Sequence, residues 1–367
     1  MPMSPKAMTA EQLYELTAQY YDLGAHRTGT PPDLATAEWF FGRLVELGAT
    51  PDRSQVAFDR YEVQTSLVDT DGEAVPCDAV YYEFLGHFEG GEFTTTTAPA
   101  IGAGNASSFD ALLSDRDEPL VIVIEDGPPG HVVMPNRRVG DGSRPPAVVV
   151  PSNVGERLVG ARLTVDARLV PGRCESSSAV LGDGPPVTVT TPLSGWFGCA
   201  SERGSGAAIA LDLAARLAET NTVTVVACSG HELDHLGLHA WLGDAATRGG
   251  VPSGPVVHLG ASIAAARNGV LEPRFVLQGP DAPTGWVDEL TSVVAPANYQ
   301  VVTIDDPWPG EGRNWRAHTG TVLSFTGAGT WFHTAGDTPE QATTSAALGI
   351  ARDAVWNATQ ALLDRIR

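Results

Sequence analysis

The chain has 367 residues, of which 43% are hydrophobic and 18% charged, which suits one large α/β domain with an insertion or two ordinary domains. No apolar run reaches the length of about 18 residues that spans a bilayer, so no membrane anchor is expected. The 44 acidic and 23 basic residues give a formal net charge of -21, which would repel nucleic acid and anionic membrane surfaces.

The cysteines and the first residues of the chain point to the cytoplasm. Residues Met1 to Met8 hold one lysine and lack the apolar stretch of a secretory signal. Four cysteines without C-x-x-C spacing do not make a disulfide framework in a chain of this length, so we expect free thiols. These cysteines are Cys77, Cys174, Cys199 and Cys228.

Two packing helices are expected within residues 1–55. Thr9 and Gln12 predict a capping box at the start of the first helix, because each side chain can bond the other residue's backbone N–H. The second helix is predicted to run from an Asp33 cap to Gly48, with apolar residues spaced to cover a sheet.

Residues 56–180 carry a different pattern, with short apolar runs separated by Gly, Pro and Asp and no long helical period. Pro119–Glu125 and Ala147–Val150 are two such runs. The pattern predicts a β-rich insertion of short strands.

Residues 181–367 alternate between short apolar runs and helical stretches, which predicts the main α/β domain. Parallel strands covered on both faces have this character, so the expected fold is a doubly wound, mainly parallel sheet flanked by helices. A last helix should begin at a second capping box, Thr338 with Gln341. The expected strands are Val187–Thr191, Val223–Cys228, Val256–Gly260 and Phe275–Gln278, and the expected helices are Gly206–Glu219, Leu233–Ala246 and Gly285–Val294.

Ligands of such a sheet bind outside the carboxyl ends of its strands, so the polar segments that directly follow apolar strands are the ones of interest. The segments are 190–206, 228–238 and 331–340. Together with residues 26–30, they resemble the motifs of the dizinc aminopeptidase family, which includes the bacterial leucyl aminopeptidases and has glutaminyl cyclases as relatives. The resemblance follows the order of elements from about Gln12 to Leu363.

Four motifs carry the resemblance. His26-Arg27-Thr28-Gly29-Thr30 is similar to the family's Arg-x-x-Gly-[Ser/Thr] turn, and Glu202-Arg203-Gly204-Ser205-Gly206 to its Asp-Asn-x-Ser-Gly. His231-Glu232, five residues before Gly237, is similar to the family's Glu-Glu-x-x-x-x-Gly. Phe332-His333-Thr334 with Asp337-Thr338 is similar to its Tyr-His-Thr-x-x-Asp-Thr, and this match is the most specific.

The departures from these motifs concern the metal ligands. The resemblance places Glu202 at the bridging carboxylate, Glu232 at a ligand and His333 at another, but His231 replaces the family's general base. The family's first His-x-Asp is missing around Ser194, and Gly260 replaces a later carboxylate although His258 is near. A zinc site needs about four ligands, so we expect at most one zinc, held by Glu202, Glu232 and His333, or none.

Two other interpretations of these segments are weaker. His231-Glu232-Leu233-Asp234-His235 matches the H-E-x-x-H pattern of zinc proteases, but the pattern requires a continuous helix and here follows a strand directly. Cys199, near a helix start, is a candidate nucleophile. The alternative interpretation is that Cys199 is buried and packs as a small apolar residue. Ser194 is another candidate, without a G-x-S-x-G elbow.

The leading hypothesis is an enzyme of amide or peptide hydrolase ancestry that acts on a small-molecule or short peptide-like substrate. The alternatives are a metal-free acid–base enzyme at the same site, such as a lyase, isomerase or cyclase, and an inactive binding protein. Neither nucleic acid nor a membrane is an expected partner. The candidate catalytic residues are Glu232, His231, His333, Glu202 and Arg203, and the candidate substrate-binding residues are Trp196, Ser194, Cys199, His258 and Phe332.

Overall fold

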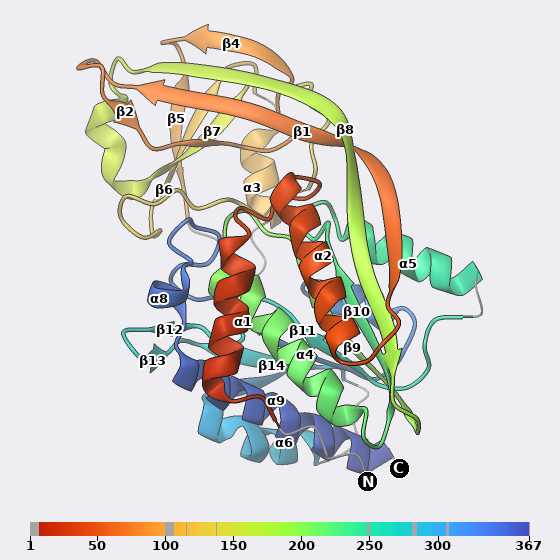
Figure 1. The fold of residues 1–367 in the computed structure, drawn as a ribbon. Coiled ribbons are helices and arrows are strands. Elements are labelled where there is room, and N and C mark those ends of the chain that lie inside the picture. The colour runs from red at the N-terminus through yellow and green to blue at the C-terminus, as the bar shows by residue number, and fades with distance from the viewer. Residues whose placement is uncertain are drawn as a thin grey trace. The chain divides into compact units, whose positions relative to one another are not determined.

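A computed structural model describes residues 7–99, 106–114, 116–136, 138–247, 250–280, 285–305 and 308–366. The chain forms two compact units. The larger unit contains Met1–Val56, Cys174–Phe332 and Asp337–Arg367, and the smaller unit contains Ala57–Arg173 and His333–Gly336. Two long strands, β1 (Asp52–Val68) and β8 (Arg162–Leu181), pass from one unit to the other (Figure 1).

The larger unit is built on a mixed sheet whose middle is parallel. The order is β15-β14-β16-β11-β9-β10-β8, and the neighbours among β16, β11, β9 and β10 are parallel. Strand β14 is antiparallel to β16, and β8 is antiparallel to β10. The strands are β9 (Pro186–Pro192), β10 (Thr222–Cys228), β11 (Val256–Leu259), β14 (Arg274–Gln278), β15 (Tyr299–Thr303) and β16 (Val322–Gly327).

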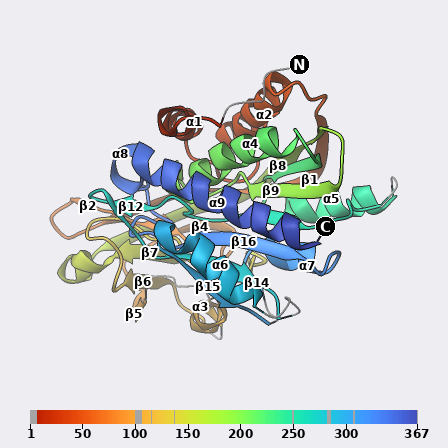
Figure 2. The same cartoon turned by 90° about the horizontal axis from the view of Figure 1, so that it is seen from below.

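Helices cover both faces of this sheet because its middle strands are apolar on both. In β10, Val225 and Ala227 join the core beneath one set of helices, whereas Val226 and Cys228 join the core on the opposite face. Helices α1, α4 and α9 lie together on the first face (Figure 2), and α5 packs on the second. The helices are α1 (Ala10–Asp22), α2 (Pro31–Glu46), α4 (Ser205–Leu217), α5 (Leu236–Thr247), α6 (Trp286–Val294), α7 (Gly312–Arg316), α8 (Pro339–Ala342) and α9 (Ser345–Ile366).

The expected α/β fold and its strands are confirmed, and so is the capping box of α1. The prediction that Asp33 caps α2 is wrong, because Thr30 is the N-cap and Asp33 lies within the first turn of the helix. Its buried carboxylate instead accepts hydrogen bonds from the Gly29 N–H and the Ser229 hydroxyl. Thr338 caps only the four-residue helix α8, and the long last helix begins afresh at Ser345.

The smaller unit is rich in strands, as expected. Its four-stranded sheet has the order β3-β7-β6-β5, and β4 pairs with β8. The expectation of short strands alone was wrong, because β1 and β8 are long. The elements are β2 (Ala74–Val75), β3 (Asp78–Ala79), β4 (Gly86–Gly90), β5 (Thr94–Ala98), α3 (Ala106–Leu113), β6 (Leu120–Ile124) and β7 (Ala147–Pro151).

Among the described residues, no helix is both long enough and apolar enough to cross a membrane.

Candidate acid–base site

The candidate site is formed by the segments that leave the carboxyl ends of β9 and β10. After β9 the chain enters a five-residue π-helical turn, η2 (Ala200–Gly204), which continues into α4. Cys199, directly before this turn, has a positive φ of 48°. Left-handed backbone at a non-glycine residue and π-helical turns are both frequent at functional sites, which makes this segment a candidate on backbone grounds alone.

The segment after β10 is a turn over residues 229–235, and α5 begins only at Leu236. Asp234 and His235 have positive φ values of 51° and 61°, so the H-E-x-x-H residues do not share a helix. His231 therefore lies in a loop, and α5 begins three residues later than the predicted start at Leu233. The zinc protease interpretation is wrong for the same reason.

A buried arginine connects the two carboxylates predicted for the site. Arg203 Nη2 lies 3.1 Å from Glu202 Oε1 and 3.2 Å from Glu232 Oε1. Its Nε donates a 2.7 Å hydrogen bond to the Ser194 carbonyl, and its side chain is only 1% exposed. Burial alone would lower the pKa of Arg203, but Glu202 and Glu232 raise it, so the guanidinium keeps its charge.

Ser194 joins the two segments of the site. Its hydroxyl donates to Glu232 Oε2 at 2.7 Å and accepts from the His231 N–H at 2.9 Å. The sequence predicted Ser194 as a substrate-binding residue, which stays a prediction, and in the structure its hydroxyl is hydrogen-bonded to Glu232.

Glu311, which the sequence analysis missed, contacts His231. Its Oε1 lies 3.2 Å from His231 Nδ1, and its buried Oε2 has no hydrogen-bond partner among the described residues. Burial raises the pKa of Glu311 to about 8, Arg203 opposes this rise, and Glu232 adds to it. The sequence offered no signal for Glu311, because it lies in a loop before α7 and outside the three strand-end segments.

Asp337 also belongs to the site and was missing from the candidate residues, although it was part of the most specific motif. Its two carboxylate oxygens accept the backbone N–H groups of Ser201 and Glu202 at 2.8 and 2.9 Å. Burial raises its pKa to about 8, with a further rise from Glu202. The motif could have indicated this residue, but only the fold shows that it holds η2.

Cys199 and His258 are buried within the larger unit. The Cys199 thiol lies 3.5 Å from Glu202 Oε2, and burial and that carboxylate raise its pKa well above the usual value. A thiol that resists ionisation is a poor nucleophile, so the geometry favours the buried small-residue interpretation. His258 Nδ1 lies 3.1 Å from Ser324 Oγ, and burial lowers its pKa to about 3, so its imidazole is neutral.

The remaining candidates contribute in different ways. Trp196 is buried and its carbonyl accepts from Arg27 Nε at 3.0 Å, while Phe332 is half-buried in a turn closed by a bond to the Gly329 carbonyl. His333 belongs to the smaller unit, where its Nδ1 lies 2.9 Å from the Met134 carbonyl. Its convergence with the carboxylates of the larger unit stays a prediction.

Three buried groups lie close enough to be considered as metal ligands. Cys199, Glu202 and Asp337 offer atoms within 4.8 Å of one another. However, both Asp337 oxygens already accept backbone N–H groups, and Glu202 Oε1 faces the Arg203 guanidinium. A divalent ion bridging Glu202 and Glu232 would have to displace that guanidinium, so the present arrangement does not fit one.

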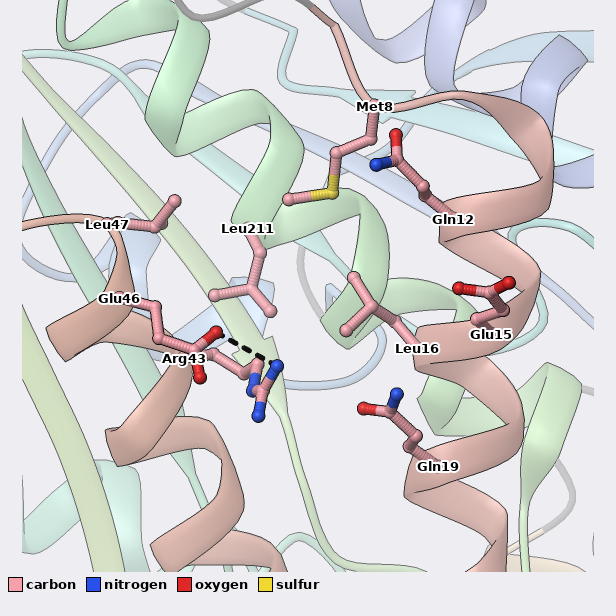
Figure 3. Close-up of a pocket in the computed structure, with 9 residues that line it drawn as sticks. All are labelled: Met8, Gln12, Glu15, Leu16, Gln19, Arg43, Glu46, Leu47 and Leu211. Atoms are coloured by element: carbon pink, nitrogen blue, oxygen red, sulfur yellow. Dashed lines mark ion pairs between the residues drawn. The ribbon is translucent and has the colours of Figure 1, made fainter.

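A separate groove lies between α1 and α2, with Leu211 of α4 at its base (Figure 3). Its volume is about 230 Å³, and an ion pair of 2.9 Å joins Arg43 and Glu46 at its side. None of the site residues lines it, and its remaining lining consists of Met8, Gln12, Glu15, Leu16, Gln19 and Leu47. The groove offers no cluster of reactive groups comparable to the one at the strand ends.

Comparison with solved structures identifies the fold as that of zinc aminopeptidases. A zinc aminopeptidase from Bacillus subtilis is similar over 96% of this chain and 95% of its own, with a TM-score of 0.72 and 14% identity. A peptidase M28 precursor from Shewanella amazonensis has a TM-score of 0.66 and 14% identity, covering 95% and 94% of the two chains. A glutaminyl cyclase from Porphyromonas gingivalis has a TM-score of 0.54 and 11% identity, covering 98% and 99%.

At these sequence identities the similarity establishes the fold alone, and the reaction must be inferred from the residues of the site. No protein-family model matches the sequence, and no curated protein sequence matches it. The solved structures thus confirm the resemblance inferred from the four motifs, as a likeness in fold.

Proposed function

We propose that the chain is a metal-independent acid–base enzyme that acts on a small, peptide-like substrate at the ends of β9 and β10. The observation that carries this proposal is the contact between His231 and Glu311, 3.2 Å long, beside a carboxylate that a buried arginine and a serine hold in place. A carboxyl group whose pKa is raised to about 8 exchanges its proton near neutral pH, as general acids and bases must.

The residues divide into groups that move protons and groups that orient them. Of His231 and Glu311, His231 has the more exposed side chain, at 21%, and Glu311 is fully buried. The His231 ring is therefore the group that can reach a substrate. In this arrangement the buried carboxyl group of Glu311 orients the imidazole ring of His231. Glu232, held on one oxygen by Ser194 and on the other by Arg203, supplies a second acceptor of protons.

The substrate class rests on the similarity of the fold to zinc aminopeptidases and a glutaminyl cyclase. Those names describe the neighbours, and we extend from them only the size and peptide-like character of the substrate. Cleavage of an amide, closure of a ring and elimination all use a base and an acid that act on one small molecule, and His231 with Glu311 and Glu232 are our candidates for these two roles.

An enzyme of hydrolase ancestry with at most one metal, held by Glu202, Glu232 and His333, was the leading hypothesis from sequence. The position of Arg203 between Glu202 and Glu232 favours the metal-free alternative instead. An inactive binding protein is the third alternative, and the raised pKa values of buried Glu311 and Asp337 favour an enzyme over it.

The test is a turnover assay with aminoacyl amides, short peptides and N-terminal glutaminyl peptides, each run with and without a chelator and read by mass spectrometry. We expect conversion of one substrate group that survives chelation and falls by about 100-fold or more in Glu232→Gln, since proton transfer by one side chain contributes that much. Glu289→Gln is the control, because Glu289 is an exposed residue of α6 that pairs with Arg365. Conversion that disappears with the chelator and returns with zinc would contradict the proposal.

A further inference from the structure

We propose that Arg203 takes the place of a divalent cation in this fold, and that its guanidinium closes a latent metal site formed by Glu202 and Glu232. The solved structures that share the fold include a zinc aminopeptidase. The proposal concerns metal binding alone and does not rest on the proposed function, because a chain with or without acid–base activity can carry this replacement.

The geometry places one nitrogen where a bridging ion would compete for the same oxygens. Arg203 Nη2 lies 3.1 Å from Glu202 Oε1 and 3.2 Å from Glu232 Oε1, which are the distances of an ion pair with two carboxylates. Zinc binds carboxylate oxygen at about 2.0–2.2 Å, so an ion shared by these two oxygens would occupy the space of the guanidinium nitrogen. The nitrogen and the metal therefore exclude each other.

The guanidinium is anchored so that it does not leave this position easily. Its Nε donates to the Ser194 carbonyl at 2.7 Å, and its own backbone N–H donates to the Cys199 carbonyl at 2.9 Å. All three charged side chains are buried, so moving the arginine out would leave two carboxylates without a counter-charge. A buried pair of that kind needs either a proton or another cation.

The charges explain why a metal and this arginine do not coexist. Two carboxylates and one guanidinium sum to a formal charge of -1, and a divalent ion added to them would sit directly against a fixed positive charge. Without the guanidinium, the two carboxylates and a divalent ion would be neutral together. The Cys199 sulfur lies 3.5 Å from the other oxygen of Glu202, Oε2, and so next to one end of this site.

The experiment measures zinc binding to the full chain by competition with a chromophoric chelator, and counts bound zinc by elemental analysis after desalting. We expect no stoichiometric zinc on the wild type and one equivalent on Arg203→Met, bound at least about 100-fold more tightly because a neighbouring positive charge is gone. Arg203→Met/Glu232→Gln should lose the gained site. Arg216→Met is the matched control, since Arg216 lies on α4 and faces the Asp212 carboxylate at 3.5 Å.

Two outcomes would overturn the proposal. One is a wild-type chain that binds one or two zinc ions which Glu232→Gln removes, and the other is a folded Arg203→Met that binds zinc no more tightly than the wild type. Arg203→Gln, which keeps a hydrogen-bond donor and removes the charge, is the second variant if Arg203→Met does not fold. If neither folds, the comparison of wild type with Glu232→Gln decides. If a folded Arg203→Met gains no zinc, the proposed function still stands, whereas zinc held by Glu232 in the wild type would count against both proposals.

Discussion

At the scale of single residues, several buried carboxyl groups of the larger unit have raised pKa values, and the values of Asp33, Glu311 and Asp337 bear on the site. Burial is the main cause in each, and it raises the pKa to about 7 for Asp33 and to about 8 for Glu311 and Asp337. A protonated acid in these positions avoids placing further negative charge beside Glu202 and Glu232. The site is therefore coupled to pH through groups that lie behind the side chains nearest to solvent.

The pH dependence of stability tests the Glu311 environment. Glu311 ionises near 4.5 when unfolded and near 8 when folded, so between these values the folded state holds more protons. Its contribution to stability is fully present below about pH 4.5 and is lost as the pH rises to about 8, by up to about 1.4 kcal/mol per pH unit. Glu311→Gln cannot ionise, so its unfolding free energy should decline less over this range than that of the wild type.

Urea denaturation at several pH values provides the measurement, with Glu289→Gln as the exposed control. Asp33 and Asp337 remain in both proteins, so a residual decline is expected in the Glu311→Gln chain. Parallel pH curves for wild type and Glu311→Gln would show that Glu311 ionises normally in the folded state.

The π-helical turn η2 is the element that presents both Glu202 and Arg203, and it depends on a distant carboxylate. Helix starts leave backbone N–H groups without partners, and here Asp337 accepts two of them, from Ser201 and Glu202. Glycine at position 198 is required just before the turn, since a Cβ there would lie 2.4 Å from the Tyr21 ring. The turn is thus held by residues from both ends of the chain.

Asp337→Asn should lower the unfolding free energy by about 1–3 kcal/mol, because an amide has one acceptor oxygen and leaves one buried N–H unpaired. Asp353→Asn is the control, since Asp353 is exposed on α9 and pairs with Arg352. Chemical denaturation of the two variants measures the difference. Equal stability of both variants would mean that the contacts of Asp337 with Ser201 and Glu202 contribute nothing.

At the scale of the whole molecule, the reactivity of the four cysteine thiols tests how well the interior of each unit is protected from solvent. All four are free thiols, and three of them are buried. Burial raises the pKa of Cys77 to about 11 and the pKa values of Cys174, Cys199 and Cys228 further. Thiols react as thiolates, so the native chain should label slowly.

Labelling without reductant should find four reactive thiols in denaturant and almost none within the same time in the native chain. A shortfall of two thiols in denaturant would reveal a disulfide and would contradict the expectation of a reducing compartment. Rapid labelling of one thiol in the native chain would identify a region that opens more readily than the structure indicates.

The sequence by itself determined the fold class and the location of the candidate site. Apolar runs such as Val223–Cys228 predicted buried strands, and the alternation with helices predicted the sheet. Because ligand sites of such sheets follow the strand ends, the segments could be singled out by position, and the resemblance of their motifs then named Glu202, Arg203 and Glu232. The structure brings these three side chains together.

Only the tertiary structure decided which partners these side chains meet. Glu311 reaches His231 across 80 positions of sequence, and Asp337 reaches η2 from the far end of the chain. The role of Asp33 could not be decided from sequence either. Its carboxylate can cap its own helix or bond the distant Ser229, and only the fold brings Ser229 close to it. Local sequence sets the period and the ends of elements, whereas contacts between distant loops depend on strand register and on the path of each turn.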